Sequence, residues 1–475
     1  MTLDAVVVGA GPNGLAAAIT LARAGRSVEV FEAAPTPGGG ARSAELTLPG
    51  FVHDVCSSVH PLAVGSPFFR SVDLAAHGVE WVEPDAQLAH PLDDGRVAFL
   101  ERSVEATAAG LGRDAARWRR LMGPLAADLD KLLPAILGPV VRVPRHPIAL
   151  VRFGLPALLP ATALARLAFR TDPARALFGG MAAHSMLRLD ALASASFGLV
   201  LGLLGQTVGW PVARGGSGTI VTALVDELTA LGGVVHTDHA IASLDDLPQA
   251  RAILLDTTPT AALSIAGRRI GPVRRWFARR FRYGPGVFKL DLALDGPLPW
   301  RTGEVARAAT VHLGGALPEL AASEAAVAEG RLPERPFVLL VQASLFDRTR
   351  APDDGQTVWA YCHVPRGFEG DATAVIEAQI ERFAPGFRDR VIGRRSTGPA
   401  ELEAYDANYV GGDINAGLAD LRQLILRPWP ALDPYRLGRG LFLCSSSTPP
   451  GGGVHGMSGW HAAQSALRHE LRHAR

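Results

Sequence analysis

Cysteine and lysine are both scarce in this chain of 475 residues, and each scarcity is informative. The three cysteines, Cys56, Cys362 and Cys444, lie far apart and form no CxxC or CxxxxC pair. Disulfide-reductase chemistry needs such a pair, and a secreted domain held by disulfides needs more cysteine, so both classes are excluded. Only Lys131 and Lys289 among the 47 basic residues are lysine. The arginine bias indicates a GC-rich bacterial genome and makes each lysine notable.

The chain also lacks an excess of charge of either sign. Its 47 basic and 46 acidic residues give a net charge of +1, which provides no electrostatic footprint for nucleic acid. Apolar residues make up 48% and charged residues 20%, as in folded proteins, and the length predicts two lobes. The apolar N-terminus carries Asp4, no basic region and a glycine motif, which argues against a signal peptide. We therefore expect a cytoplasmic protein.

The first 32 residues hold the most informative pattern of the chain. It consists of an apolar strand at 4–8, a glycine turn, an alanine-rich helix at 15–25, a second strand at 27–31 and a terminal acid, Glu32. A bare GxGxxG is weak, but this whole context is typical of a dinucleotide-binding βαβ unit. We expect residues of the glycine turn and of the end of the second strand to bind the dinucleotide. They are Gly9, Gly11, Pro12, Asn13, Gly14, Glu32 and Ala33.

Each glycine of the turn has a physical role. Gly9 permits the tight turn, Gly11 lets a diphosphate approach the backbone, and Gly14 lets the helix pack closely on the strand. The start of the helix offers unpaired N–H groups and a positive dipole end to the diphosphate. Glu32 can accept both hydrogen bonds of a ribose diol and would repel a 2′-phosphate.

The segment after Glu32 indicates which dinucleotide is bound. Five residues separate Glu32 from Gly38-Gly39-Gly40-Ala41-Arg42-Ser43. This spacing resembles the second flavin motif of the FAD-dependent amine oxidase and phytoene desaturase superfamily. The resemblance implies flavin contacts at Gly39, Gly40, Ala41, Arg42 and Ser43. Gly40 stands where many members have an arginine, so that contact is absent here.

Two later regions complete the resemblance. Residues 210–218 predict a loop, 219–231 a helix and 234–241 a strand-loop that passes the adenine of FAD near Ile241 in the superfamily. Residues 252–259 predict another sheet strand, with Thr257 at its end. Near the C-terminus, a strand at 440–444 precedes a second GxGxxG at 451–456 and a helix from 457 to 472. We interpret its N-terminus, Gly453, Val454, His455, Gly456 and Met457, as a second anchor of the same flavin.

These patterns predict an α/β (α+β overall) fold with a Rossmann-type FAD-binding lobe built from separate segments. That lobe is expected to comprise residues 1–75, 205–265 and 431–475. The substrate lobe is expected to comprise 76–204, mainly helical, and 266–430, with a mixed or antiparallel sheet. We expect strands at 286–294, 337–342 and 357–363. Apolar and polar residues alternate along several of them, which suits a sheet with one side facing a cavity.

Lys289 and His53 are the candidate catalytic residues. Lys289 interrupts an apolar strand, and its setting resembles the amine-oxidase strand whose lysine holds a water at flavin N5 and is linked to reoxidation by O2. The alternative is a structural lysine paired with Asp291. His53, followed by Asp54, can act as a base near neutral pH or line the pocket, and a structural role fits equally. No set of ligands with metal-site spacing is present.

The polar, glycine-rich segment 404–415 predicts a loop facing the substrate. Together with His53-Asp54 and residues 448–457, it resembles the phytoene-dehydrogenase-related branch that includes the pyridine nucleotide-disulfide oxidoreductase domain-containing protein 2 group. The resemblance covers nearly the whole chain. It implies an oxidoreductase with non-covalent FAD that removes a hydride equivalent from an apolar or amphipathic substrate, with O2 or a quinone as electron acceptor. An O2-dependent amine oxidase and a non-catalytic lipid-binding or regulatory protein are the alternatives.

Two segments of the predicted helical region suit a membrane as well as a protein core. Residues 142–170 carry five arginines and no acid, which suits docking on an anionic bilayer. Residues 191–210 are uncharged and near the length of a membrane span. In both cases a buried helix around an apolar pocket is the favoured interpretation.

Overall fold

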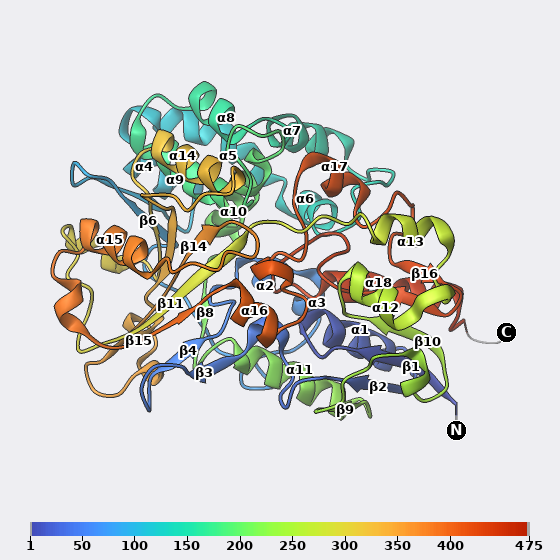
Figure 1. Cartoon of the computed structure of the whole chain (residues 1–475). Helices are drawn as coiled ribbons and strands as arrows, with labels where there is room; N and C mark the ends of the chain where they lie inside the picture. The colour runs from blue at the N-terminus through green and yellow to red at the C-terminus, as the bar shows by residue number, and fades with distance from the viewer. Residues whose placement is uncertain (1, 473–475) are drawn as a thin grey trace.

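The computed structural model describes residues 2–472, in which two large sheets lie side by side (Figure 1). The first sheet has the strand order β16-β17-β10-β1-β2-β9. All its neighbouring strands are parallel except β16, which runs antiparallel to β17. Its strands are β1 (Leu3–Val8), β2 (Val28–Phe31), β9 (Val234–His236), β10 (Ala250–Leu255), β16 (Arg436–Gly438) and β17 (Leu441–Leu443).

The second sheet is mixed and has the strand order β15-β11-β14-β13-β12-β6-β7. Only β6 and β12 pair in parallel. Its strands are β6 (Leu88–Pro91), β7 (Val97–Leu100), β11 (Gly286–Leu294), β12 (Thr310–Leu313), β13 (Val338–Val341), β14 (Gln356–Val364) and β15 (Val391–Thr397). Two small antiparallel pairs complete the β structure: β3 (Ser43–Glu45) with β4 (Val52–Asp54), and β5 (Trp81–Val82) with β8 (Val212–Ala213).

Helices cover both sheets. Those of the N-terminal half are α1 (Pro12–Arg23), α2 (Pro61–Gly65), α3 (Pro67–Arg70), α4 (Val104–Gly110), α5 (Ala115–Ala127), α6 (Leu129–Ile136), α7 (Pro147–Ala157), α8 (Ala161–Ala168), α9 (Asp172–Ala183) and α10 (Ala195–Thr207). The others are α11 (Gly218–Ala230), α12 (Pro259–Ala266), α13 (Pro272–Ala278), α14 (Leu317–Ala328), α15 (Thr373–Phe383), α16 (Pro399–Tyr405), α17 (Leu421–Leu426) and α18 (Met457–His469). The predicted α/β class, with a Rossmann-type parallel sheet and a second mixed sheet, is confirmed.

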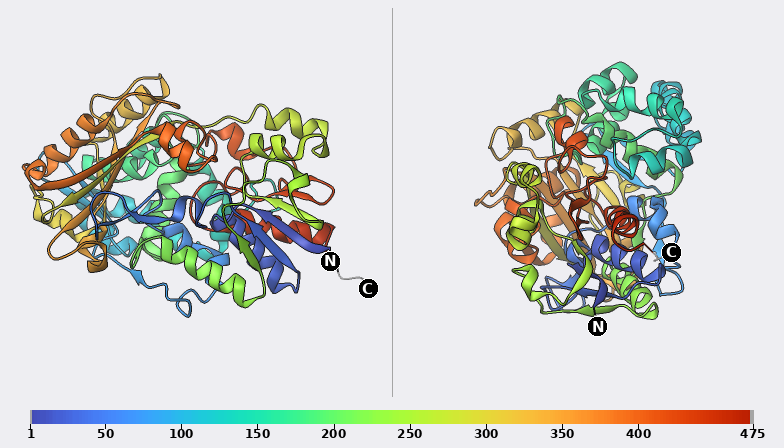
Figure 2. Two further views of the ribbon diagram at one scale, coloured as in Figure 1. Left: turned by 60° about the horizontal axis from the view of Figure 1, so that its bottom comes forward. Right: turned by 90° about the vertical axis from the view of Figure 1, so that its right-hand side faces the viewer.

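The two ends of the chain meet at the first sheet, where α1 and α18 pack together (Figures 1 and 2). Their contact is backbone to backbone: a Cβ on Gly459 would lie 1.8 Å from the carbonyl oxygen of Asn13. Only glycine can occupy such a position. The N-terminal glycine turn and the C-terminal glycine segment, more than 400 residues apart, therefore lie at one place in the fold.

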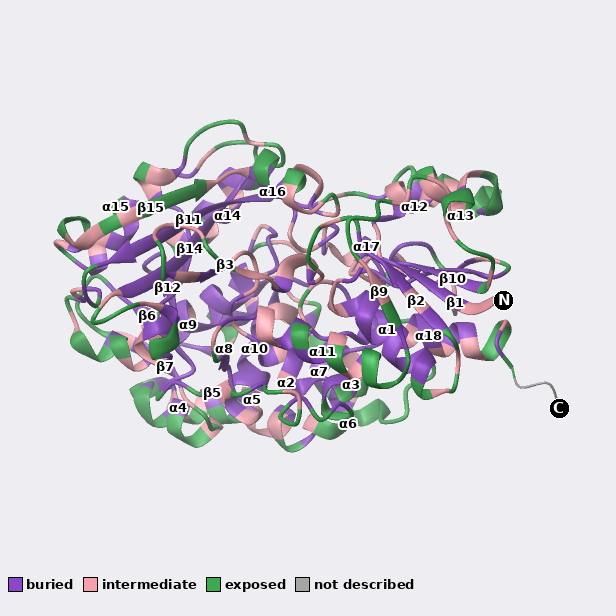
Figure 3. Cartoon of the chain, turned by 90° about the horizontal axis from the view of Figure 1, so that it is seen from below, coloured by how far each residue is buried: buried purple, intermediate pink, exposed green. Residues whose placement is uncertain are grey.

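The central strands of the second sheet are buried on both faces, whereas the sequence predicted that one side faces a cavity, and the edge strand β15 is largely exposed (Figure 3). Every residue of β11 and β14 is buried. Trp359 and Tyr361 belong to the core shared with the helical layer that includes α5, α9 and α10, while Val358 and Ala360 belong to a core shared with α15. Successive side chains along these strands point to opposite faces of the sheet, and each face packs into a different core.

Three local expectations need correction. Residues 81–100, assigned to the helical region, form β5, β6 and β7, and the last two extend the second sheet. Of the strand-loop expected over 234–241, the strand part is short and ends at His236, and the backbone turns at Asp238 with a φ of 53°. The C-terminal helix ends at His469 rather than at residue 472.

The two segments considered for membrane contact differ in burial. Within 191–210, α10 is largely buried, which confirms the core interpretation. In 142–170, by contrast, Ile148 and Leu155 are exposed, so burial of this whole segment is wrong. Among residues 2–472, no single helix is long and apolar enough to span a membrane, although α7 and α8 pass that test as a pair bent by 103°.

Candidate functional site

Three parallel strands bring the predicted dinucleotide residues to one edge of the first sheet. In the register of the sheet, Val8 of β1 lies beside Phe31 of β2 and Leu255 of β10. The residues that follow them, Gly9, Glu32 and Asp256, are therefore neighbours at the carboxyl end of the sheet. Ligands of open parallel sheets bind at this end.

The glycine turn between β1 and α1 needs its glycines for measurable reasons. Gly9 has a φ of 99°, and a Cβ there would lie 3.0 Å from the carbonyl oxygen of Asp256. A Cβ on Gly14 would lie 2.0 Å from the carbonyl oxygen of Gly9. Gly11, the N-cap of α1, has no side chain to cap the helix, and a Cβ there would meet only the Asp256 carboxylate at 3.1 Å. The start of α1, where Pro12 and Asn13 lie, suits an anion beside the Asp256 carboxyl, which itself accepts the N–H of Gly14.

Glu32 joins this turn to the end of β2. Its Oε2 accepts a hydrogen bond from the N–H of Ala10 at 2.7 Å, and its Oε1 accepts one from Ala34 at 2.9 Å. The Arg42 guanidinium lies 3.5 Å from Oε1. Each carboxylate oxygen has further lone pairs, so Glu32 retains acceptors for a ribose while holding its own loop. Ala33 lies between Glu32 and Ala34, whose N–H Glu32 accepts.

The predicted adenine segment after β9 runs beside this loop. The N–H of Asp238 donates to the carbonyl of Ala34 at 3.1 Å, and the N–H of His239 donates to the carbonyl of Glu32 at 2.8 Å. Ile241 packs at the edge of the core beneath β10 and β17. Thr257 directly follows Asp256 at the carboxyl end of β10. The structure thus brings both predicted contacts to the same edge as Glu32.

The second motif also packs on the glycine turn. The N–H of Gly38 donates to the carbonyl of Ala10 at 2.9 Å, and a Cβ on Gly39 would lie 3.4 Å from Cα of Gly11. Ala41 is fully buried beneath it. The Arg42 guanidinium donates to the carbonyl of Thr36 at 2.6 Å.

Gly40 departs from the superfamily pattern for a visible reason. A Cβ on Gly40 would lie 1.9 Å from the hydroxyl of Tyr409. Nearby, the hydroxyl of Tyr405 donates to the carbonyl of Gly39 at 2.8 Å, and the Arg42 guanidinium lies 5.2 Å from the centre of its ring. The tyrosines thus occupy the space that an arginine at position 40 would need. Segment 404–415, expected to face the substrate, packs here against the cofactor motif.

Sequence reasoning missed a pair of acids at this edge. The carboxylate of Asp256 accepts a hydrogen bond from the N–H of Gly14 at 2.8 Å. Burial raises the pKa of Asp256 to about 8, and the nearby carboxylates Asp406 and Glu32 add to the rise. Burial also raises the pKa of Asp406. No motif covers these acids, because they meet through folding.

The C-terminal anchor is held by His455. The hydroxyl of Ser66 donates to the His455 carbonyl at 2.6 Å, and the N–H of Met457 donates to Nδ1 of the His455 ring at 3.0 Å. Gly456 has a φ of 65°, and a Cβ there would lie 2.9 Å from the Ala16 side chain of α1. Gly453 and Val454 precede it in the loop that enters α18. The N–H of Met457, expected to face the flavin, is therefore paired within the chain.

Lys289, Asp291 and His53 form a buried cluster beside the second motif. Lys289 is 2% exposed, and its ammonium donates to the Asp291 carboxylate, the alternative that the sequence left open. Both lie on β11, a central strand of the sheet. Nδ1 of His53 lies 3.5 Å from the other Asp291 oxygen, and Nε2 lies 2.8 Å from the Thr47 hydroxyl. The β3–β4 pair, in which Ala44 lies opposite His53, links this cluster to the second motif.

Burial sets the protonation of this cluster. It lowers the pKa of His53 to about 3, and the positive charge of Lys289 contributes. Burial also raises the pKa of Asp291, against the effect of Lys289. His53 is therefore a neutral imidazole near pH 7, so it can accept a proton only when the ring is stabilised by a charge that develops during the reaction.

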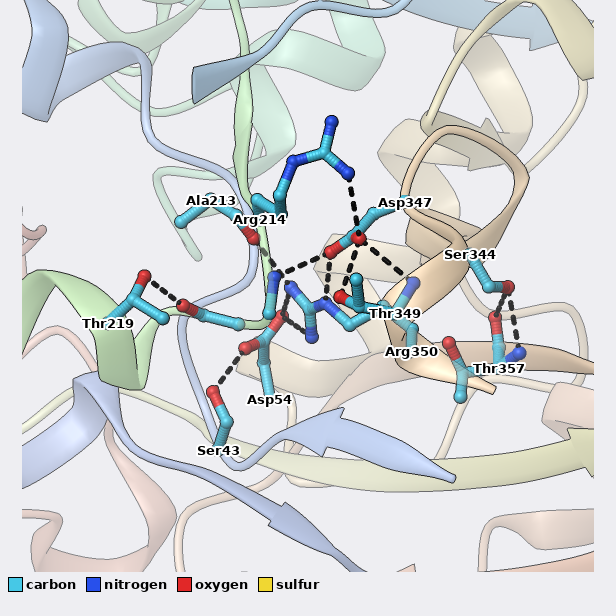
Figure 4. A network of polar contacts seen from close by, with 12 residues as sticks. Ser43, Asp54, Ala213, Arg214, Thr219, Ser344, Asp347, Thr349, Arg350 and Thr357 are labelled. Carbon is cyan, nitrogen blue, oxygen red and sulfur yellow. Dashed lines mark hydrogen bonds and ion pairs between the residues drawn. The ribbon is translucent and has the colours of Figure 1, made fainter. Parts of the chain in front are cut away.

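Asp54 lies in a buried network of hydrogen bonds and ion pairs (Figure 4). This fits the structural role that the sequence allowed for the His53-Asp54 pair. Its carboxylate accepts hydrogen bonds from Ser43 at 2.8 Å and from the N–H of Ser217 at 2.8 Å, and it pairs with Arg350 at 3.1 Å. Burial alone would raise the pKa of Asp54, but Arg350 and the donated hydrogen bonds lower it. The hydroxyl of Ser43, a predicted flavin contact, therefore donates its hydrogen bond to Asp54 within the chain. The buried Arg350 also pairs with Asp347 at 3.0 Å.

Comparisons with known proteins agree with this geometry. The model of the NAD(P)-binding Rossmann-like domain matches residues 7–72. The rat pyridine nucleotide-disulfide oxidoreductase domain-containing protein 2 is 26% identical over 98% of this chain and 93% of its own length. The hydroxyneurosporene desaturase of Cereibacter sphaeroides is 35% identical over 38% of each chain.

Among solved structures, a putrescine oxidase variant has the same fold, with a TM-score of 0.63, 16% identity and 98% of both chains covered. The dinucleotide edge, the two converging glycine segments and these relatives lead to one assignment. The chain contains a Rossmann-like domain, is similar over nearly its whole length to the rat protein and shares its fold with an amine oxidase, and these likenesses support an oxidoreductase.

Proposed function

We propose that this protein binds FAD non-covalently and removes a hydride equivalent from an apolar or amphipathic substrate. The observation that carries the cofactor proposal is the meeting of the start of α1, Glu32 and the start of α18 at one edge of the first sheet. These residues fit the diphosphate, the ribose and the far end of FAD, respectively. When bound, the flavin would supply the hydride acceptor.

Non-covalent binding is expected because no cysteine or histidine lies in a recognisable flavin-linkage motif, and the state of the cysteines supports it. All three are free, Cys362 and Cys444 are buried, and burial raises the pKa of Cys56 to about 11. A thiol with so high a pKa has almost no thiolate near neutral pH, so it is a poor nucleophile toward a flavin. We expect acid precipitation to release the flavin into solution.

The pairing of Lys289 with Asp291 favours a dehydrogenase over an oxidase. In the oxidase alternative, a single positive charge near the flavin assists the reduction of O2. Here the carboxylate of Asp291 balances the charge of Lys289 in a buried pair, so little net charge remains. The relative named as a hydroxyneurosporene desaturase supports an isoprenoid-like substrate, and a quinone would then be the electron acceptor.

Anaerobic reduction tests this function. The flavoprotein is mixed without O2 with a detergent-dispersed isoprenoid or with an alkylamine, and the flavin absorbance is followed. We expect the isoprenoid, and not the amine, to bleach the flavin, and a quinone to restore the colour faster than O2 does. Bleaching by the amine with rapid reoxidation by O2 would assign the amine oxidase alternative. A chain that takes up no flavin would be the non-catalytic protein.

The raised pKa of Asp256 predicts that FAD binding depends on pH. A diphosphate beside this carboxyl favours its protonated form, so above pH 8 binding must first take up a proton. We expect the Kd of wild-type protein for FAD to rise by about ten-fold between pH 7 and pH 9. In Asp256→Asn, which keeps an acceptor for the N–H of Gly14, we expect no such rise. Fluorescence titration of the apoprotein measures both, and parallel curves for the two proteins would refute the role of Asp256.

A further inference from the structure

A long stretch of the helical region contains no acidic residue. Residues 131–171 hold none of the 46 Asp and Glu residues of the chain. They hold six basic residues: Lys131, Arg142, Arg145, Arg152, Arg166 and Arg170. This stretch includes α7 and α8, which lie at the outer edge of the helical layer (Figure 1).

Helix α7 is apolar on both of its faces. Phe153 and Ala157 are buried in the core of the helical layer. On the opposite side, Ile148, Val151 and Leu155 are 77%, 57% and 66% exposed. Their spacing of three and four residues places them in one stripe along the helix. A helix on the surface of a globular protein ordinarily has polar residues on such a face.

Further exposed apolar residues flank α7 in the chain on both sides. We call the whole group the 140–158 surface, and its apolar members are Val140, Val141, Val143, Ile148, Val151, Leu155 and Leu158. Val143, in the loop before the helix, is 90% exposed. Gatherings of large exposed apolar side chains mark sites of contact with a protein or a membrane.

Positive charge accompanies the 140–158 surface. Arg145 is exposed and, within residues 2–472, forms no ion pair. Arg142 is also exposed, and its guanidinium donates to a backbone carbonyl, that of Pro134. Arg152 pairs with Asp128 at 2.6 Å. The surface therefore presents exposed apolar side chains together with two arginines, Arg142 and Arg145, that form no ion pair within residues 2–472.

We propose that the 140–158 surface docks on an anionic lipid bilayer, with α7 lying in the plane of the membrane interface. Apolar side chains would enter the acyl boundary while Arg142 and Arg145 contact lipid phosphates. A second copy of the chain fits less well, because a two-fold contact would bring the arginines of both copies together without acids between them. The proposal goes beyond the proposed function and does not depend on it.

Vesicle binding tests this surface. The full-length protein is sedimented with vesicles of phosphatidylcholine alone, or with vesicles in which about one third of the lipid is phosphatidylserine. We expect binding to the anionic vesicles, weakened by salt. The variant Ile148→Ser/Leu155→Ser should lose at least about ten-fold in partition coefficient. Arg145→Gln should lose about five-fold, which corresponds to one charge near the surface.

A matched control separates docking from a general loss of surface hydrophobicity. Val234 on β9 and Ile392 on β15 are 47% and 50% exposed, and Val234→Ser/Ile392→Ser should bind vesicles like the wild type. Equal losses in the two double variants would overturn the proposal, as would absence of wild-type binding to anionic vesicles. Oligomers that Ile148→Ser/Leu155→Ser dissociates, without vesicle binding by the wild type, would assign the surface to a second copy instead.

Discussion

Replacing Glu32 with alanine is expected to weaken FAD binding by at least about 100-fold. Two hydrogen bonds from the ribose to a charged acceptor are lost, each worth about 1.5–3 kcal/mol. The carboxylate also accepts the N–H groups of Ala10 and Ala34, so its removal loosens the loop that faces the ribose. Titration of the apoprotein with FAD, followed by flavin fluorescence, measures the change in Kd.

Glu29 provides the control for this experiment. It lies on the same strand, β2, and pairs with His236 at 2.9 Å, away from the glycine turn. Glu29→Ala should retain FAD like the wild type. If Glu32→Ala also retains FAD with unchanged affinity, Glu32 does not bind the ribose.

Replacing Lys289 with methionine is expected to lower the free energy of unfolding by about 3–5 kcal/mol, because it leaves the buried Asp291 carboxylate without its partner. The double variant Lys289→Met/Asp291→Leu, which removes both charges and keeps apolar volume, should unfold near the wild-type denaturant midpoint. Urea denaturation near neutral pH measures both. Equal stability of Lys289→Met and the wild type would contradict the buried ion pair.

The same double variant separates the dehydrogenase from the oxidase. Stopped-flow experiments measure flavin reduction by substrate and reoxidation by O2 as separate steps. The dehydrogenase proposal predicts that reoxidation by O2 keeps its wild-type rate. A slowing on the order of 10², or about 2.7 kcal/mol of barrier, would show that Lys289 serves the reaction with O2.

The sequence predicted the first sheet well because each part of it has a local signature. Gly14 is required by a contact with Gly9, which is nearby in sequence, and Gly9 by its φ of 99° in the turn itself. Strand β10 and the glycine segment before α18 could likewise be predicted from an apolar run and from turn residues. Sequence patterns are sufficient to predict those elements whose formation depends on local backbone geometry.

The parts that the sequence did not reveal depend on contacts between distant residues. Arg350 reaches Asp54 across 296 positions, and nothing in either neighbourhood marks the pair. The space at Gly40 is taken by Tyr409, so the departure from the superfamily pattern is explained only by the fold. The outer face of α7 was predicted to be buried because its residues are apolar, and apolar composition alone does not tell a core helix from an exposed apolar one.

The flavin content of the purified protein tests the central claim most directly. Its absorption spectrum is recorded, the protein is precipitated with acid, and the supernatant is assayed for FAD. The account predicts a yellow protein that releases FAD in an amount equal to the protein. A colourless chain that takes up no FAD when it is added, or flavin that stays with the precipitate, would contradict it.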